Sequence, residues 1–108
     1  MKILKFLLIV SLLSIFNNII ALADEAKMKK GLEIFNETAA CAACHILKAA
    51  GSQGNIGPNL DTVSMTIESV VDMVTNGLGV MPAFGEGDML TKEEIETVSY
   101  FVVNSVEG

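Results

Sequence analysis

Two cysteines and a histidine that lie close together are the residues of this chain best suited to chemistry. Cys41 and Cys44 are separated by two alanines, and His45 directly follows the second cysteine. Each thiol of such a pair can add to one vinyl group of a porphyrin as a thioether, and the adjacent imidazole can then bind the iron. The spacing therefore predicts one covalently attached haem c, with His45 as the proximal ligand of its iron.

Other uses of a Cys-x-x-Cys pair fit the rest of the chain less well. The 108 residues contain two cysteines and one histidine, so all three lie in this motif. A zinc site usually takes four protein ligands, and the sequence has no second pair to complete one. A structural disulfide across two residues would stabilise little, because the entropic gain grows with loop length. A redox-active disulfide is the third alternative, and it usually accompanies a βαβ pattern that this chain lacks.

A ligand for the other side of the iron is predicted in the apolar loop over residues 79–85. Met81 precedes Pro82 there, and a residue before proline is disfavoured in a helix. A thioether is a soft ligand that suits low-spin haem iron, so Met81 is the candidate sixth ligand. The alternative is that it fills a gap in the core, as methionines commonly do. Two other methionines are expected in the core on helices, and two more near helix starts: Met28 and Met73, then Met65 and Met89.

The loop after the cysteine motif offers a partner for the histidine. Residues 48–59 are rich in glycine, serine and asparagine and end in Gly57-Pro58-Asn59. Proline has a fixed φ and keeps its carbonyl, so Pro58 provides a rigid acceptor for the second ring nitrogen of a ligating histidine such as His45. The repeated glycines are not a phosphate-binding loop, because the Gly-Lys-Ser/Thr ending of such loops is missing.

Two amphipathic helices are predicted at the two ends of the chain beyond residue 23, and they are expected to cross. The first runs from Asp24 to about Glu37 and contains Gly31, which costs about 1 kcal/mol against alanine and indicates a close helix contact. Phe35 lies one turn later on the same face and is expected in the core. The last helix opens with the capping box Thr91-Lys92-Glu93-Glu94 and runs to about Ser105. Its apolar stripe is the expected partner of the first helix: Ile95, Val98, Phe101, Val102 and Val106.

A short helix is predicted between these two, over residues 66–75. Either Ser64 or Thr66 suits its N-cap. Its apolar face contains four residues: Ile67, Val70, Val71 and Val74. Asn76-Gly77 should end the helix, because these residues accept the left-handed backbone found at helix C-termini.

The first 23 residues have the pattern of an export signal. A short basic region is followed by an uncharged, mostly apolar run over residues 6–16, and Ala21-Leu22-Ala23 gives the small-x-small pattern of a cleavage site. We expect cleavage after Ala23, which leaves one domain over residues 24–108 in the periplasm. The alternative is an uncleaved membrane anchor, since the apolar region is near the length that spans a bilayer.

Acidic side chains dominate the chain after Ala23. Of the seven basic residues, Lys2 and Lys5 lie in the predicted signal, which leaves five lysines against thirteen acidic residues. Such a surface repels phosphates and argues against nucleic-acid binding. It favours a redox partner protein with a basic docking patch; the alternative is that the acidity only provides solubility.

The sequence resembles the class I c-type cytochromes, most of all the small soluble ones that replace plastocyanin in algae and cyanobacteria, and related bacterial carriers. Three motifs and a C-terminal amphipathic helix carry the resemblance: Cys41-Ala42-Ala43-Cys44-His45, Gly57-Pro58-Asn59-Leu60 and Met81-Pro82-Ala83-Phe84. The resemblance implies an all-α fold of three to four helices around one covalently bound haem, with the N- and C-terminal helices crossed. It also implies thioethers at Cys41 and Cys44, axial ligands His45 and Met81, and a Pro58 carbonyl that accepts from the histidine ring.

The sequence also departs from that family. Cys41 follows Phe35 by six positions, which is longer than the usual spacing. The chain has no tryptophan, although some relatives have one, and it lacks the lysine ring of mitochondrial cytochrome c. A mitochondrial type of docking surface is therefore not expected.

These features predict a monomeric, periplasmic one-haem electron carrier and not an enzyme. Its donor would be a quinol-oxidising complex or a dehydrogenase, and its acceptor a protein such as a terminal oxidase. Three other functions remain open at this level. They are a dedicated cytochrome subunit of one periplasmic dehydrogenase, a haem-based gas sensor with an open sixth site, and a thiol–disulfide oxidoreductase without haem.

Overall fold

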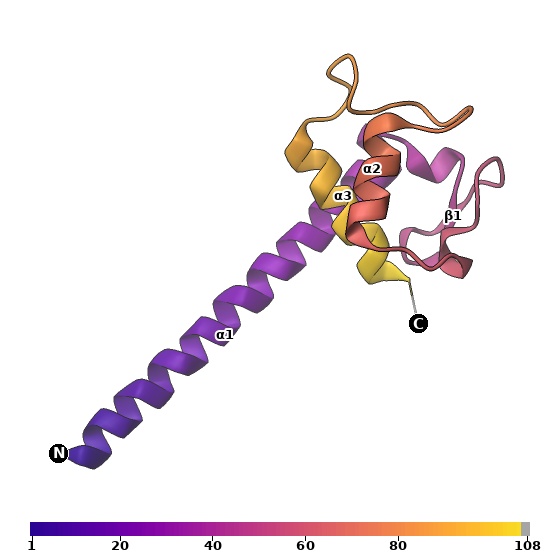
Figure 1. Cartoon of the computed structure of the whole chain (residues 1–108). Helices are drawn as coiled ribbons and strands as arrows, with labels where there is room; N and C mark the ends of the chain where they lie inside the picture. The colour runs from indigo at the N-terminus through magenta and orange to yellow at the C-terminus, as the bar shows by residue number, and fades with distance from the viewer. Residues whose placement is uncertain (107–108) are drawn as a thin grey trace.

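The computed structural model describes residues 1–106 and is mainly helical (Figure 1). Its α-helices are α1 (Lys2–Glu33), α2 (Ile67–Asn76) and α3 (Lys92–Ser105). Two short strands, β1 (Ile46–Leu47) and β2 (Ser52–Gln53), pair antiparallel with Ile46 opposite Gln53. The first two thirds of α1 project from the rest as a rod, and the remaining chain folds around the other end of this helix.

The predicted crossing of the first and last helices is confirmed. Gly31 of α1 is buried against α3, and a Cβ atom placed on it would overlap Phe101 and come within 2.9 Å of the carbonyl oxygen of Thr97. Phe35 is buried one turn later, with its ring edge-on to that of Phe101 at a centroid distance of 5.9 Å. Glycine at position 31 therefore lets the two helix backbones approach closely, and the aromatic pair packs beside that contact.

The end of the first helix differs from the prediction. The α-helical pattern stops at Glu33, and a π-helical turn follows over Ile34–Thr38, in which the N–H of Ala39 donates to the carbonyl of Ile34 at 2.9 Å. A π turn holds more residues than an α turn. It therefore accommodates the long interval between Phe35 and Cys41 before the chain reaches the cysteine motif.

The other two helices begin where their capping residues predict. Thr66 caps α2, with Ser69 as the reciprocal partner at 3.1 Å in both directions, and Thr91 and Glu94 cap α3 in the same way. Gly77 follows α2 with φ 67° and ψ 175°, so its φ is positive as expected, but its ψ is extended and not left-handed helical. The chain therefore leaves α2 in an extended direction.

The predicted loop over residues 48–59 is more ordered than expected. It contains β2 and the turn that joins it to β1, and the buried Ser52 hydroxyl accepts from the N–H of Leu47 at 2.9 Å. The N–H of Lys48 donates to the Asp61 carboxylate at 2.9 Å, which ties the hairpin to the chain before α2. These contacts hold the segment that follows the cysteine motif.

The N-terminal part of α1 is not buried against the rest of residues 1–106. Residues 1–26 are exposed, and the helix that contains them is long and apolar enough to cross a membrane by length and composition. A signal sequence meets the same criterion, so cleavage after Ala23 stays a prediction.

Candidate functional site

The histidine of the motif is held by the loop that the sequence singled out. His45 Nδ1 lies 2.8 Å from the carbonyl oxygen of Pro58. Because a carbonyl can only accept, Nδ1 is the donor of this contact, which leaves Nε2 as the ring nitrogen available to a metal. The N–H of Gly57 also donates to the carbonyl of Cys44 at 2.8 Å, so the loop contacts both the ring of His45 and the residue before it.

Gly57 is part of this site, which sequence reasoning did not recognise. A Cβ atom on Gly57 would come within 2.5 Å of Cε1 of His45, so a larger residue would displace the ring. The sequence could have indicated this role, because Gly57 directly precedes Pro58. When the Pro58 carbonyl contacts His45, the residue before it lies against the ring.

The two cysteines are presented by a single turn of backbone. Cys41–Ala43 forms a 3₁₀ turn, and the carbonyl of Cys41 accepts from the N–H groups of Cys44 at 3.1 Å and His45 at 2.9 Å. Ala40, with a left-handed φ of 52°, brings the chain into this turn. Both thiols are free and half-buried. One turn therefore groups the two thiols with the imidazole.

The environment of Cys41 disfavours a redox-active disulfide. Burial, reinforced by the neighbouring Cys44, raises the pKa of the Cys41 thiol to about 11. Thiol–disulfide oxidoreductases depend on a thiolate stabilised by a lowered pKa. Cys41 instead stays protonated near neutral pH, as suits a thiol that is consumed once in a thioether bond.

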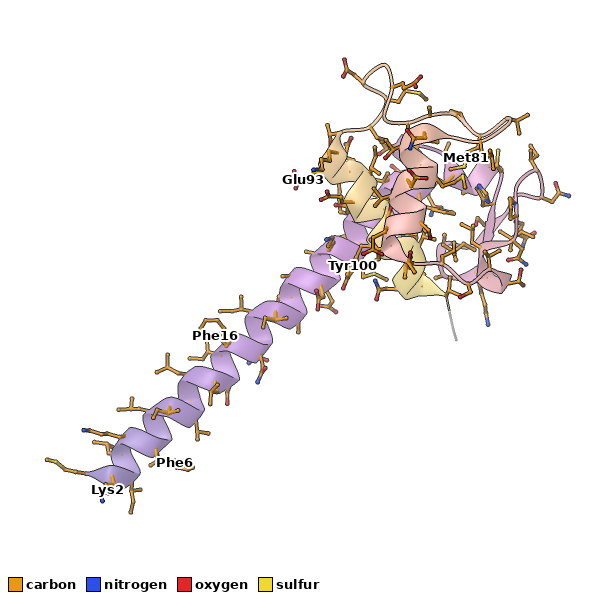
Figure 2. All side chains as sticks on the ribbon, viewed as in Figure 1. Lys2, Phe6, Phe16, Met81, Glu93 and Tyr100 are labelled. Atoms are coloured by element: carbon orange, nitrogen blue, oxygen red, sulfur yellow. The ribbon has the colours of Figure 1, made fainter. Side chains whose placement is uncertain are left out.

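Met81 lies in a loop that is tied to the end of α2. It is half-buried against the core and pairs with Leu78, each donating its N–H to the other's carbonyl at 3.0–3.2 Å. The N–H groups of Phe84 and Gly85 donate to the carbonyls of Val74 at 2.9 Å and Thr75 at 3.1 Å. Figure 2 shows Met81 on the domain, on the far side from the free end of α1. The loop that contains Met81 is thus fixed to the end of α2.

Gly77 was expected only to end a helix, but it also supports this loop. A Cβ atom on Gly77 would come within 2.5 Å of the Met81 carbonyl oxygen, and the positive φ of 67° independently favours glycine. The close approach follows from the extended exit from α2, which the sequence did not indicate.

The remaining methionines are placed less uniformly than predicted. Met28 and Met65 are half-buried against the core. Met73 is 40% exposed, so its expected core position is wrong, and Met89 is 51% exposed. The buried face of α2 is formed by Val70 and Val74. Met73 lies outside this face, which explains its exposure.

The side chains present fit a covalently attached haem. They comprise an imidazole whose Nδ1 contacts Pro58 and whose Nε2 is available, two free thiols in the same turn, and a thioether on a separate loop. Nitrogen and soft sulfur donors of this kind suit haem iron, whereas dications such as Mg²⁺ prefer oxygen. When bound, a haem supplies an iron that changes between the ferrous and ferric states.

Comparisons with known proteins agree with this chemistry. Residues 26–102 match the family model described as cytochrome c oxidase, cbb3-type, subunit III. Cytochrome c6 of Gracilaria tenuistipitata var. liui is 36% identical over 102 residues, which cover 87% of each chain. Cytochrome c6 of Rippkaea orientalis is 34% identical over 96 residues, which cover 82% of this chain and 78% of the relative.

A solved structure shows the same fold. The crystal structure of the c-type cytochrome SorU from Sinorhizobium meliloti is 44% identical and superposes with a TM-score of 0.70, over 76% of this chain and 93% of that one. The sequence matches, the shared fold and the Cys-x-x-Cys-His turn lead to one conclusion. The chain belongs to the class I c-type cytochromes, and it is a monohaem electron carrier whose haem c is attached through Cys41 and Cys44.

Proposed function

We propose that the chain is exported, that residues 1–23 are a cleaved signal peptide, and that residues 24–108 carry single electrons in the periplasm. The donor is a quinol-oxidising complex or a dehydrogenase, and the acceptor is a protein such as a terminal oxidase. Two observations support export. Residues 1–23 are exposed and mostly apolar, and the family match begins at residue 26, just beyond the predicted cleavage site.

In this proposal His45 and Met81 are the two axial ligands of the iron. The observation that carries it is the 2.8 Å contact between His45 Nδ1 and Pro58, because it fixes the tautomer and orients the ring. The Pro58 carbonyl also increases the basicity of Nε2. Met81 closes the sixth position, which favours a high potential and leaves no open site for substrate chemistry. We therefore expect a carrier and not an enzyme.

An optical spectrum of the protein produced with the haem-attachment machinery tests the proposal. We expect covalently bound haem in the periplasmic fraction, and the weak red band of ferric haem with a methionine sulfur ligand. Met81→Ala should lose this band and keep the covalent haem, whereas Met65→Ala, which removes another half-buried methionine, should retain it.

Other outcomes would point to other functions. A colourless, folded protein would contradict the carrier function, and a band that survives in Met81→Ala would contradict the ligand assignment. Carbon monoxide binding by the native ferrous protein would indicate an open sixth site and support the gas sensor.

A second candidate is a dedicated subunit of a larger redox enzyme. The observation that favours it is the description of the matching family model, which names a subunit of an oxidase. A subunit should purify in a stable complex, whereas a carrier should purify as a monomer that meets its partners transiently. Size-exclusion chromatography of the native periplasmic protein separates the two.

The partners of the carrier are expected to present a basic docking patch. Thirteen acidic residues, against five lysines after the predicted signal, would steer such a partner towards the domain. The rate of electron transfer should then fall as salt is added. If acidity serves only solubility, this rate should change little with salt.

A further inference from the structure

A groove lies where α1, α2 and α3 meet, and the haem-binding residues described above do not line it. Its volume is about 520 Å³, and all three helices contribute to its walls. Tyr100 of α3 forms one wall, and Figure 2 shows it near the point where α1 enters the domain. The groove is therefore a surface feature of the domain that haem binding does not use.

The floor of the groove is apolar because α2 carries apolar residues on two faces. Val70 and Val74 point into the core and are buried. Ile67 and Val71 lie one turn apart on the side that lines the groove, and Ile67 is 36% exposed. Within residues 1–106 no segment covers this strip, so it can contact the aliphatic part of another molecule.

The rim of the groove is mainly acidic. Glu68 and Asp72 lie one turn apart on α2, and Glu96 faces them from α3. Lys27 also lines the groove, but its ammonium lies over the Tyr100 ring at 4.7 Å from the centroid. The exposed Lys92 lies 4.0 Å from the Glu96 carboxylate but does not line the groove, so the lining itself has three carboxylates and one ammonium and is negative.

The groove reaches the backbone that holds Met81. Thr75 lines the groove, and its carbonyl accepts from the N–H of Gly85, in the loop that contains Met81. The carbonyl of Val74, the preceding residue, accepts from Phe84 of the same loop. The groove therefore borders the end of α2 to which the Met81 loop is attached.

We propose that this groove docks a cationic, amphipathic segment of an electron-transfer partner. Lysine or arginine side chains of the segment lie against Glu68, Asp72 and Glu96. Their aliphatic parts, with neighbouring apolar residues, cover Ile67 and Val71, beside the Tyr100 ring, over which Lys27 lies. Charge complementarity around an apolar centre is the usual construction of a specific interface. The proposal rests on the carrier function and adds to it a defined place and chemistry of contact.

A synthetic peptide that repeats lysine and leucine serves as the probe of the groove. It is titrated into isotope-labelled holo-protein at low salt, and the amide chemical shifts are followed by nuclear magnetic resonance. The largest shifts are expected in α2, over Ile67–Asn76, and around Tyr100. Glu68→Gln/Asp72→Asn should weaken binding roughly fivefold to tenfold, because both removed charges lie on the groove rim.

Glu86→Gln/Asp88→Asn is the matched control. It removes the same charge from an exposed loop that does not line the groove, and it should change the affinity less than about twofold. Ile67→Ser tests the apolar floor and should weaken binding about threefold without any change in charge. Circular dichroism of each variant shows that the fold is retained.

Equal weakening by both charge-removing pairs would overturn the proposal, because it would show attraction to net charge alone. Shifts that cluster away from α2 and Tyr100, or an unchanged affinity in Ile67→Ser, would also overturn it. Reduction of the haem by ascorbate needs no docking. A protein whose haem ascorbate cannot reduce would contradict the carrier function. A protein whose haem is reduced normally but that does not bind the peptide in the groove would contradict only the docking proposal.

Discussion

The two sides of the haem site are held in place by different means. On the histidine side the proposed ligand itself makes the contact, since His45 Nδ1 donates to the Pro58 carbonyl at 2.8 Å. On the methionine side the contacts described are between backbone groups, from Phe84 and Gly85 to the last turn of α2. The ring of His45 is thus oriented directly, whereas Met81 is positioned through its loop.

The surroundings of the two sides also differ. Leu47, close to His45 in the chain, is fully buried, whereas Leu78 and Val80 next to Met81 are 70% and 88% exposed. Segments with few buried apolar contacts open at lower free energy than segments in the core. We therefore expect the methionine side to open first, while the histidine side stays attached to the haem.

The largest effect is expected when the attachment on the histidine side is removed. Cys41→Ser/Cys44→Ser eliminates both thioethers, so haem should no longer survive denaturing electrophoresis. A domain of this size has a small core and depends on its cofactor, so the variant should also lose most of its helical circular dichroism. A variant that keeps native helicity without haem would show that the cofactor does not complete the core.

A smaller effect is expected when the methionine side is strained. Gly77→Ala introduces a Cβ against the Met81 carbonyl, at a φ of 67° and ψ of 175° that is essentially restricted to glycine. We expect a loss of about 1–3 kcal/mol in the free energy of unfolding and a weaker methionine band, with covalent haem retained.

Gly79→Ala is the matched control for this change. Gly79 also has a positive φ, of 59°, but a Cβ atom there would meet no atom within 4 Å. It should cost about 1 kcal/mol from backbone strain alone and leave the methionine band unchanged. An equal loss of the band in both variants would show that contact with Met81 is not the cause.

Gly57→Ala tests the histidine side in the same way. Its Cβ would press on the His45 ring, a side chain that can shift, so we expect a cost of about 1–2 kcal/mol in chemical denaturation. A weakened contact with Pro58 should also move the midpoint potential, while the methionine band persists. Loss of the band in this variant would mean that the two sides are coupled and not independent.

Features that are determined by residues close together in the sequence were predictable. The Cys-x-x-Cys-His motif, the Thr66 N-cap of α2 and the capping box of α3 each depend on residues a few positions apart, and the structure places them as expected. The Pro58 acceptor lies 13 positions from His45, but the rigid carbonyl of proline made it predictable. Gly31 was also informative, because a glycine inside a helix has few explanations other than a close contact.

Features that depend on distant segments were not predictable in the same way. The π turn over Ile34–Thr38 and the β1–β2 hairpin are local but also escaped prediction, since each strand of the hairpin has only two residues, too few to show an alternating pattern. The contact of Gly57 with the histidine ring depends on how two segments pack. The exposure of Met73 could have been predicted, because this residue falls outside the apolar face of α2 that contains Val70 and Val74.

The smallest expected effect concerns Ser99, which local pattern also missed. Its side chain is fully buried in α3, and its hydroxyl has no hydrogen-bond partner among the described residues. Ser99 falls one turn after Ile95 on the buried face, although serine in a helix is ordinarily expected to face water.

Ser99→Ala removes a buried hydroxyl that is not hydrogen-bonded and should raise the free energy of unfolding by about 0.5–1 kcal/mol. Ser69→Ala, which breaks the capping box of α2, should lower it by a similar amount. Neither change is at His45 or Met81, so the optical spectra of both variants should stay native. A shifted methionine band in Ser99→Ala would show that packing within α3 affects the methionine side.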